Sequence, residues 1–567
     1  MSRSRFSSVG SGSVCYIFGV RIMRLGIDFG TTRIVVAAVD RGNYPVAQFE
    51  TPDGVTADWF PPLIAVREAE RRYGWQAWSL QSEPGWTIVR SLKRLLRNAG
   101  PATEVEIAEQ RLPMQLLLDE LTAQLRSDLL ERSTLSSSPG ERLEIYLGVP
   151  ANANSNQRFL EVEAFRRSGF EVLGLLNEPS AASIEFSHYQ RTNSNGKNDG
   201  VLLVYDLGGG TFDASVVEMG EKSHVVLGSE GIVTLGGDDF DEILAELALA
   251  QSGVGEEEQD SLTQAQLFCL HEECRQKKET LHANSRKVVV DLSCVREGWG
   301  ELSLSVADYY EACRPLVEET LHAVEYLLER HDLTAGDGAS GRAQTDRIEA
   351  VYVAGGGSEL PLVPRMLRDR FGRRVRRSTH ARTTTAIGLA IQADAEAGYH
   401  VRDRFTRYFG VWREAEGGSR IAFDPLFSKE EALPAAGEQP LSIERRYSPV
   451  HNIGHFRYLE SSHITADGQP SGDIMFWDEI RFPFDPSLED NSELGRLSVH
   501  LSDQASRQAV QESYSCDAGG ALTLTITNQT DGHSRRFQLG SWAGTSKPIR
   551  PGREARRKSH AATKAPR

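Results

Sequence analysis

The spacing of apolar residues divides this chain into a mixed helix-and-strand part and a later strand-rich part. Up to about residue 395, short apolar runs typical of strands alternate with stretches in which leucines recur at three- and four-residue steps. Met114–Arg132 and Val306–Arg330 have this helical period, so we predict two long helices there. Beyond residue 395, short alternating segments are separated by Gly, Pro, Asp and Asn, which predicts antiparallel strands.

Alternation of apolar and polar residues is clearest near the end of the strand-rich part. In Leu522–Thr527 the apolar side chains share one face and the threonines the other, as in a half-buried strand. Leu497, Val499 and Leu501 have the same spacing and predict a second such strand. We therefore expect an antiparallel β-sandwich behind an α/β domain. The predicted boundaries are 23–395 for the α/β domain, 396–412 for a linker and 413–545 for the sandwich.

A tight glycine turn between two strands occurs twice in the first part of the chain. Each copy ends its first strand in an aspartate, Asp28 or Asp206, and continues with glycine and threonine. Glycine is needed where the backbone bends sharply or approaches another group closely. We predict that the two copies belong to two similar lobes that face one another. The copies are strand 24–28, turn 29–32 and strand 35–40, and strand 201–206, turn 208–211 and strand 212–217.

A third glycine cluster, Gly355-Gly356-Gly357, follows a predicted strand and precedes a predicted helix. Phosphate oxygens require converging N–H donors, and backbone approaches them most closely where side chains are absent. We predict that the three turns bind the phosphates of ATP, with the hydroxyls of Thr31, Thr32 and Thr211 near the terminal phosphates. The predicted nucleotide-binding glycines are Gly30, Gly208, Gly209, Gly210, Gly355 and Gly356.

The two strand-ending aspartates suit a magnesium ion. Mg²⁺ keeps most of its waters while one or two carboxylates hold it, so Asp28 and Asp206 are predicted to bind it through waters. A single Asp-x-Gly-Thr turn is most simply a hairpin, but two copies and a third glycine cluster favour a nucleotide site. The chain has no P-loop and no dinucleotide-binding fingerprint, which leaves an actin-like cleft.

Composition excludes several other classes of function. The formal net charge of −16 disfavours nucleic acid and anionic membranes as partners, because a strongly anionic body repels their phosphates. Six cysteines without paired spacing favour a reducing compartment, and no run approaches the ~18 apolar residues of a membrane span. We therefore predict a cytoplasmic location. The predicted disordered segments are a Ser/Arg/Gly-rich extension at 1–22 and a basic tail at 546–567.

Six segments, in this order and with these spacings, resemble the seventy-kilodalton heat-shock chaperone family of actin-like ATPases. The segments are Gly26–Thr32, Lys93–Leu95, Val149–Pro150, Asn177–Ala182, Asp206–Asp213 and Leu235–Asp241. The resemblance covers Met23 to about Asp394 and implies a two-lobed domain that hydrolyses ATP. It also implies an ATP-dependent chaperone that acts in protein folding and the stress response.

The resemblance implies catalytic roles for Lys93, Glu178, Asp206 and Thr211. Lys93 would position the attacking water and stabilise the charge on the γ-phosphate, because a cation acts strongly in a cleft that holds little water. Glu178 would lie near the water and the metal shell. Asp206 and Asp213 would supply carboxylate for proton acceptance or ion binding, with K⁺ as a candidate ion besides Mg²⁺. Taken alone, Lys93 also suits a surface helix, and Glu178 suits a helix cap.

Two further features concern communication between the domains. Pro150 and Arg158 resemble the family's interdomain switch, a proline that sets backbone geometry and an arginine eight residues later. A rigid turn followed by an ordinary surface charge is the alternative. The linker lacks the family's leucine-rich, aspartate-flanked run, which predicts altered coupling between the domains.

The adenosine-binding helix of the family is matched here only by Lys278. Glu279 and His282 stand where an arginine and a serine are common, and Glu359 replaces a second base-facing arginine. Cation stacking on adenine, which contributes up to about 2 kcal/mol, is weakened by these changes. We therefore predict a nucleotide affinity below that of typical members.

The strand-rich part is only loosely similar to the family's peptide-binding sandwich, and we expect no long helical lid over it. Because little would then cover a bound peptide, fast release is predicted. The implied partners are unfolded or extended polypeptides, co-chaperones and a nucleotide exchange factor. Two other functions remain open at this point: a nucleotide-sensing adaptor with little hydrolysis, and a metabolite kinase of the same superfamily.

Overall fold

The computed structural model describes ten stretches of the chain, which include most of both predicted parts. They are residues 22–81, 83–100, 103–135, 140–193, 200–333, 347–415, 420–434, 438–491, 493–517 and 520–539. The predicted basic tail and, apart from Ile22, the predicted N-terminal extension lie outside them.

The first lobe contains a mixed sheet with helices packed against it. Its large sheet has the strand order β11-β10-β1-β2, in which β1 pairs antiparallel with β2 and parallel with β10. The helix predicted at Met114–Arg132 is confirmed as α3. The elements are β1 (Ile22–Phe29), β2 (Ile34–Ala38), β3 (Phe49–Glu50), β4 (Thr56–Ala57), β5 (Ile64–Arg67), β6 (Glu70–Tyr73), α1 (Gly74–Trp78), β7 (Thr87–Val89), α2 (Leu92–Leu96), β8 (Glu104–Ile107), β9 (Gln110–Pro113), α3 (Met114–Glu131), β10 (Arg142–Val149), α4 (Ser155–Arg167) and β11 (Glu171–Asn177).

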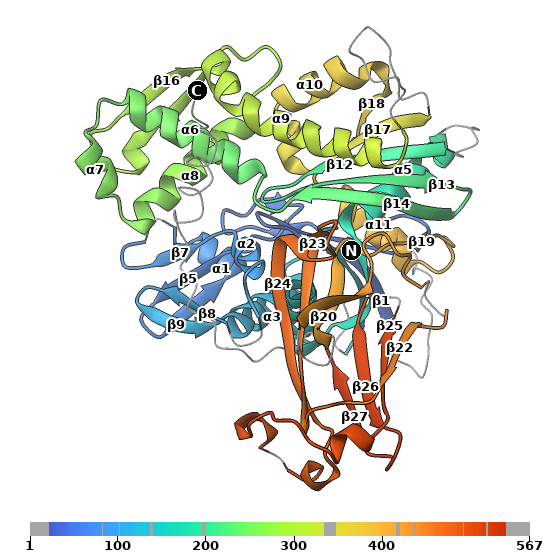
Figure 1. Cartoon of the computed structure of the whole chain (residues 1–567). Helices are drawn as coiled ribbons and strands as arrows, with labels where there is room; N and C mark the ends of the chain where they lie inside the picture. Colours follow the sequence, from blue (N-terminus) through green and yellow to red (C-terminus); the bar gives the residue numbers. More distant parts are fainter. Residues whose placement is uncertain are drawn as a thin grey trace, which may run out of the picture.

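The second lobe repeats the hairpin-plus-parallel-strand arrangement in a six-stranded sheet. Its strand order is β18-β17-β12-β13-β14-β19, with β12 antiparallel to β13 and parallel to β17. Figure 1 shows this lobe above the first one. The elements are α5 (Glu178–Asn193), β12 (Gly200–Leu207), β13 (Phe212–Met219), β14 (Ser223–Ile232), α6 (Gly237–Gln251), α7 (Glu256–Asp260), α8 (Gln264–Glu279), β15 (Lys287–Asp291), β16 (Glu301–Ser305), α9 (Val306–Arg330), β17 (Ile348–Ala354), α10 (Leu362–Phe371), β18 (Val375–Arg377), α11 (Thr384–Ala393) and β19 (His400–Arg402).

Helices α5 and α11 pack together and join the two lobes. Helix α11 lies on β1, β2 and β10 of the first lobe, whereas α5 contacts β12 and β13 of the second. The packing is close enough to require glycine: a Cβ atom on Gly388 would lie 1.9 Å from the carbonyl oxygen of Ala181. These helices therefore form a tight connection at one end of the space between the lobes.

The strand-rich part consists of two four-stranded antiparallel sheets, in the orders β21-β20-β23-β24 and β22-β25-β26-β27. Buried residues of both sheets form one hydrophobic core. The alternation predicted at Leu522–Thr527 is confirmed, because burial alternates along β26. The strands are β20 (Tyr408–Ala415), β21 (Arg420–Phe427), β22 (Leu441–Tyr447), β23 (Ile453–Ile464), β24 (Pro470–Pro483), β25 (Val510–Cys516), β26 (Leu522–Asn528) and β27 (Ser534–Gln538).

Two expectations for this part need correction. Leu497, Val499 and Leu501 do not form a half-buried strand: the segment is irregular, has one isolated bridge at Leu501, and leaves that side chain 72% exposed. The region predicted as the linker, residues 396–412, contains β19, which pairs with β14, and the first half of β20. In both cases strand pairing and not local spacing decides the outcome: the first segment lacks a partner strand, whereas part of the second pairs with β14.

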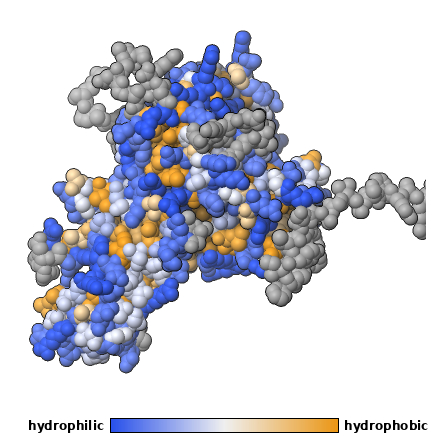
Figure 2. All heavy atoms as spheres, turned by 90° about the vertical axis from the view of Figure 1, so that its right-hand side faces the viewer, coloured by the Kyte–Doolittle hydropathy of each residue, from blue (hydrophilic) through white to orange (hydrophobic). Residues whose placement is uncertain are grey.

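One face of the molecule is mainly hydrophilic (Figure 2). Figure 2 shows one face on which hydrophobic atoms form separate patches among hydrophilic ones. Within the part of the chain that the structure describes, no helix is long and apolar enough to cross a membrane.

Candidate functional site

A cavity of about 100 Å³ lies between the lobes and is lined by nearly all the residues predicted to bind nucleotide and metal. These residues come from the first hairpin turn, the second hairpin turn, helices α2, α5 and α8, and the third glycine cluster. They are Asp28, Gly30, Thr31, Thr32, Lys93, Glu178, Asp206, Gly208, Gly209, Thr211, Lys278, Gly355 and Gly356. Gly210, Pro150 and Arg158 do not line the cavity. Three turns far apart in the sequence therefore meet around one space.

The two hairpin turns touch one another across this space. A Cβ atom on Gly209 would lie 2.5 Å from the Oγ1 of Thr32, and one on Gly210 would lie 2.5 Å from the Oγ1 of Thr31. Both separations are far below van der Waals contact, so the arrangement requires glycine at these positions. The third turn begins at Gly355, whose φ of +79° also favours glycine.

Lys93 and Glu178 form a buried ion pair beside the turns. The Nζ of Lys93 donates a hydrogen bond to the Oε1 of Glu178 at 2.9 Å, and the lysine is 6% exposed. The alternative that Lys93 is a surface helix lysine is therefore wrong. Glu178 is the first residue of α5, so the helix start fixes its position while its carboxylate holds the lysine.

Other buried carboxylates surround this pair. Burial, and next the charge of Glu178, raise the pKa of Asp28 to about 7. Burial also raises the pKa of Asp206 well above its usual value, with Glu178, Asp28 and Asp213 adding to the effect. Burial lowers the pKa of Lys93, but the neighbouring carboxylates outweigh burial and raise it overall. Because buried like charges repel one another, the cluster suits a divalent cation that would relieve this repulsion.

Three arginines and Glu279 form an ionic cluster that lines the same cavity. Glu279 accepts hydrogen bonds from Arg33 at 2.7 and 2.9 Å, from Arg275 at 2.9 Å and from Arg382 at 3.1 Å. Arg382 also pairs with Glu359 at 2.5 Å. Burial raises the pKa of the Glu279 carboxyl, but the three arginines outweigh burial and lower it to about 2. Glu279 is thus surrounded by three arginines that hold its carboxylate.

Sequence reasoning missed Arg33, Arg275 and Arg382 as residues of this site. Arg33 follows the predicted Gly-Thr-Thr turn directly, and this position could have indicated that it belongs to the site. Arg382 lies just before α11, far from any phosphate-binding motif, and nothing in its local sequence indicates a ligand. Lys278, which was predicted, binds the carboxylate of Asp241 at 2.7 Å and the carbonyl of Gly237 at 2.6 Å.

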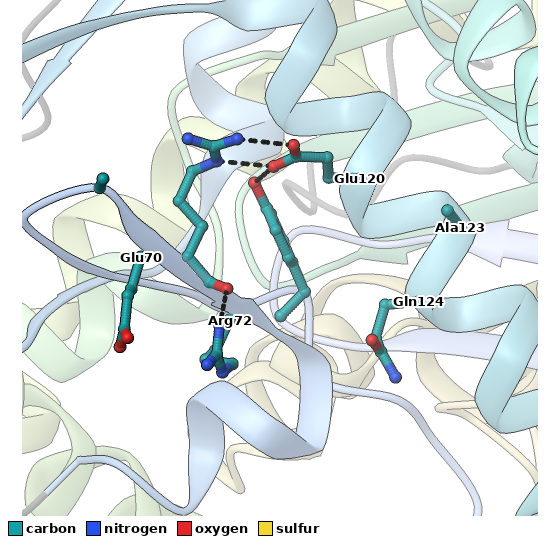
Figure 3. A pocket seen from close by; sticks show the side chains of 8 residues that line it. Glu70, Arg72, Glu120, Ala123 and Gln124 are labelled. Carbon is teal, nitrogen blue, oxygen red and sulfur yellow. Dashed lines mark hydrogen bonds and ion pairs between the residues drawn. The ribbon is translucent and has the colours of Figure 1, made fainter.

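A larger hollow of about 560 Å³ lies on the surface of the first lobe, between β6 and α3 (Figure 3). Its polar groups bind one another: Arg71 donates twice to Glu120 at 2.7 Å, and Tyr73 donates to the same carboxylate. None of the glycine turns reaches it. The smaller cavity between the lobes is therefore the candidate site, because it contains the converging charged groups.

The two predicted switch residues, Pro150 and Arg158, do not line the cavity, and Arg158 is linked to the segment that follows α11. The guanidinium of Arg158, on α4, donates to the Oδ1 of Asn177 at 2.8 Å, and burial lowers its pKa. The backbone N–H of Asn177 and the hydroxyl of Ser180 donate to Asp403 at 3.4 and 2.6 Å. Arg158 is therefore not an ordinary surface charge, and it connects to residue 403 through one intermediate side chain.

Two lobes that each bring a strand-ending aspartate and a glycine turn to one buried lysine-carboxylate cluster define a two-lobed protein with a charged cavity between its lobes. A family model described as Hsp70 protein matches residues 24–406, well over half of the chain. The chain therefore belongs to the Hsp70 family, which implies actin-like lobes.

Named relatives agree with this membership. The chain is 31% identical over 396 residues to the chaperone protein HscA of Proteus mirabilis, across 67% of this chain and 59% of that protein. It is 28% identical over 394 residues to a chaperone protein HscA homolog of Haemophilus influenzae, across 66% of this chain and 58% of the relative. The matched region thus spans somewhat under two thirds of these relatives.

Proposed function

We propose that this chain is an ATP-dependent chaperone that hydrolyses ATP in the cavity between its lobes. The observation that carries the proposal is the buried pair of Lys93 and Glu178 among three glycine turns. Family membership and similarity to relatives named as chaperones support it.

The glycine turns and their hydroxyl groups would bind the phosphates. The backbone N–H of Gly209, with the hydroxyls of Thr32 and Thr211, would hold the terminal phosphate oxygens. Lys93 would hold the attacking water and stabilise the charge that develops on the γ-phosphate, because a cation acts strongly where water is scarce.

Hydrolysis breaks the bond between the β- and γ-phosphates and transfers the γ-phosphoryl group to water. Asp206, which lines the cavity, would accept the proton of this water, since burial and then the charge of Glu178 raise its pKa well above its usual value. Asp28 and Asp206 would hold Mg²⁺ through waters, and K⁺ is a second candidate ion. When bound, Mg²⁺ supplies positive charge that neutralises the phosphates.

Binding of the nucleotide would require the lobes to move apart. The cavity of about 100 Å³ is smaller than the roughly 300–1,000 Å³ of typical ligand sites. Such a movement would pass through α5 and α11 to Arg158 and Asp403, and from there to the strand-rich part. Two lobes that open and close around a ligand are a common basis for coupling between domains.

We further propose that the two four-stranded sheets form a sandwich that binds unfolded or extended polypeptides. Co-chaperones and a nucleotide exchange factor would act on the lobes. The five cysteines within the described residues are all free thiols, which favours a reducing compartment and hence the cytoplasm.

Phosphate release from ATP, measured with and without an unfolded polypeptide, tests the proposal. We expect the polypeptide to stimulate release, and Lys93→Ala to reduce turnover by roughly a hundredfold or more. Lys287→Ala, which removes an exposed lysine on β15, is the matched control and should leave turnover unchanged.

A nucleotide-sensing adaptor is the second candidate, and the ionic cluster around Glu279 favours it. If Arg33, Arg275 and Arg382 stay bound to Glu279, nucleotide would exchange slowly and turn over little. The same assay separates the two functions: negligible turnover in the parent protein, unchanged by Lys93→Ala, would support the adaptor and reject the enzyme.

A further inference from the structure

Two guanidinium groups face the same end of the cavity from different lobes. Arg33 comes from the turn after β1, and Arg382 comes from the segment before α11. The stem of Arg382 lies beside the third glycine turn, where its Cγ would be 3.6 Å from a Cβ atom on Gly356. Both side chains line the same cavity as the three glycine turns.

The neighbours of these arginines fix their orientation. The Cζ of Arg33 lies over the Trp59 ring, 5.0 Å from its centroid, and the guanidinium donates to Glu279. The edge of Arg382 binds Glu279 and Glu359. Since hydrogen bonds use the edge of a guanidinium, its face remains able to stack on a ring.

Glu279 acts as a saturated acceptor in this cluster. Its two carboxylate oxygens accept four hydrogen bonds from Arg33, Arg275 and Arg382, which fills the roughly four positions a carboxylate offers. It is therefore occupied in holding arginines and is not free to read the edge of a base.

We propose that Arg33 and Arg382 supply the cationic planes that stack on a purine base in this cleft, with Glu279 as the residue that positions them. The inference rests on the proposed nucleotide-binding function. It names the residues that contact the base in this chain. Because stacking uses the ring face that all purines share, ATP and GTP bind with affinities within about tenfold of one another.

Calorimetric titration of the full chain with ATP, GTP and inorganic tripolyphosphate, each with Mg²⁺, tests the proposal. Arg382→Lys and Arg33→Lys keep a positive charge for the glutamates but remove the planar group. Each should lower affinity for ATP and GTP by about fivefold to tenfold and leave tripolyphosphate binding unchanged. Arg296→Lys is the matched control, because Arg296 pairs with Glu258 and stacks on Trp299 outside the cavity.

Several results would overturn the inference. An equal loss of tripolyphosphate binding would mean that the arginines act through charge on the phosphates, and unchanged ATP binding in both variants would exclude base contact. If the parent protein binds GTP more than tenfold more weakly than ATP, it distinguishes the hydrogen-bonding edges of the two bases, which contradicts recognition by stacking alone. Failure of the parent to bind ATP and tripolyphosphate alike would instead reject the proposed function itself. Two variants on separate elements, each checked by its thermal unfolding midpoint, guard against misfolding of either one.

Discussion

Burial strongly shifts the pKa values of individual ionisable side chains in this protein. Lys93 keeps its charge in the interior because carboxylates surround it, whereas the carboxyl groups themselves are driven toward their neutral form. Glu185 on α5 is a simpler case, in which the hydroxyl of Tyr352 on β17 donates a hydrogen bond to the buried carboxylate. Burial raises the pKa of Glu185 from 4.5 to about 7.

This pKa shift predicts a pH-dependent loss of stability. Between about pH 4.5 and 7 the folded chain retains a proton on Glu185 that the unfolded chain releases, so stability falls as pH rises through this window. Glu185→Gln keeps the shape without the charge and should raise the free energy of unfolding at pH 8 by up to about 3 kcal/mol. At pH 4 the variant and parent should be nearly equal. Denaturant unfolding at both pH values measures this, and equal stability at pH 8 would contradict it.

At the scale of elements, the two sheets of the strand-rich part are joined by a buried polar contact as well as by apolar packing. Arg413 on β20 binds Glu512 on β25 at 2.7 and 3.0 Å, and Glu512 is fully buried. The hydroxyls of Tyr447 and Tyr514 donate to the same carboxylate. The contact therefore fixes how one sheet lies on the other.

Removal of the arginine should destabilise this part strongly. Arg413→Met leaves Glu512 buried without a cation, which we expect to cost about 3–5 kcal/mol in the free energy of unfolding. The double variant Arg413→Met/Glu512→Gln should recover most of this loss, because no unpaired charge remains. Denaturant unfolding of the full chain, followed by the fluorescence of Trp477 and its neighbours in this core, measures both. A loss below about 1 kcal/mol in the single variant would show that the contact is not needed.

At the scale of the whole molecule, ionic contacts join the lobes to the strand-rich part. Glu230 on β14 binds Lys429, which follows β21, at 2.8 Å and Arg330 at the end of α9 at 2.9 Å. On the other lobe, the hydroxyl of Ser155 donates to Glu460 on β23. Both lobes therefore touch the strand-rich part, and a change in their separation would alter these contacts (Figure 1).

These contacts predict a variant in which the domains are uncoupled. Glu230→Gln removes the charge that pairs with Lys429 and Arg330 without touching the cavity, so basal ATP turnover should be unchanged. Stimulation by an unfolded polypeptide should fall by roughly twofold or more. Glu171→Gln, which breaks an exposed ion pair with Arg142, is the matched control. Full stimulation in Glu230→Gln would show that coupling does not pass through this contact.

Local sequence patterns determined much of this protein. Helix α9 has the bounds that the spacing of its apolar residues predicts, and β26 alternates as its threonines predict, because side-chain direction in these elements follows from residue spacing alone. The glycine turns could also be predicted from the sequence. A backbone that approaches another group closely needs glycine, and this requirement does not depend on where the rest of the site lies.

Only the tertiary structure determined which of these segments come into contact. The cluster of Arg33, Glu279 and Arg382 joins residues far apart in the sequence, and no spacing rule connects them. Leu501 has the spacing of a strand residue but lacks a partner strand over its neighbours, so it lies exposed. The physical reason is the same in both cases: spacing sets the direction of a side chain along its own element, whereas burial and charge pairing depend on what the rest of the chain places opposite it.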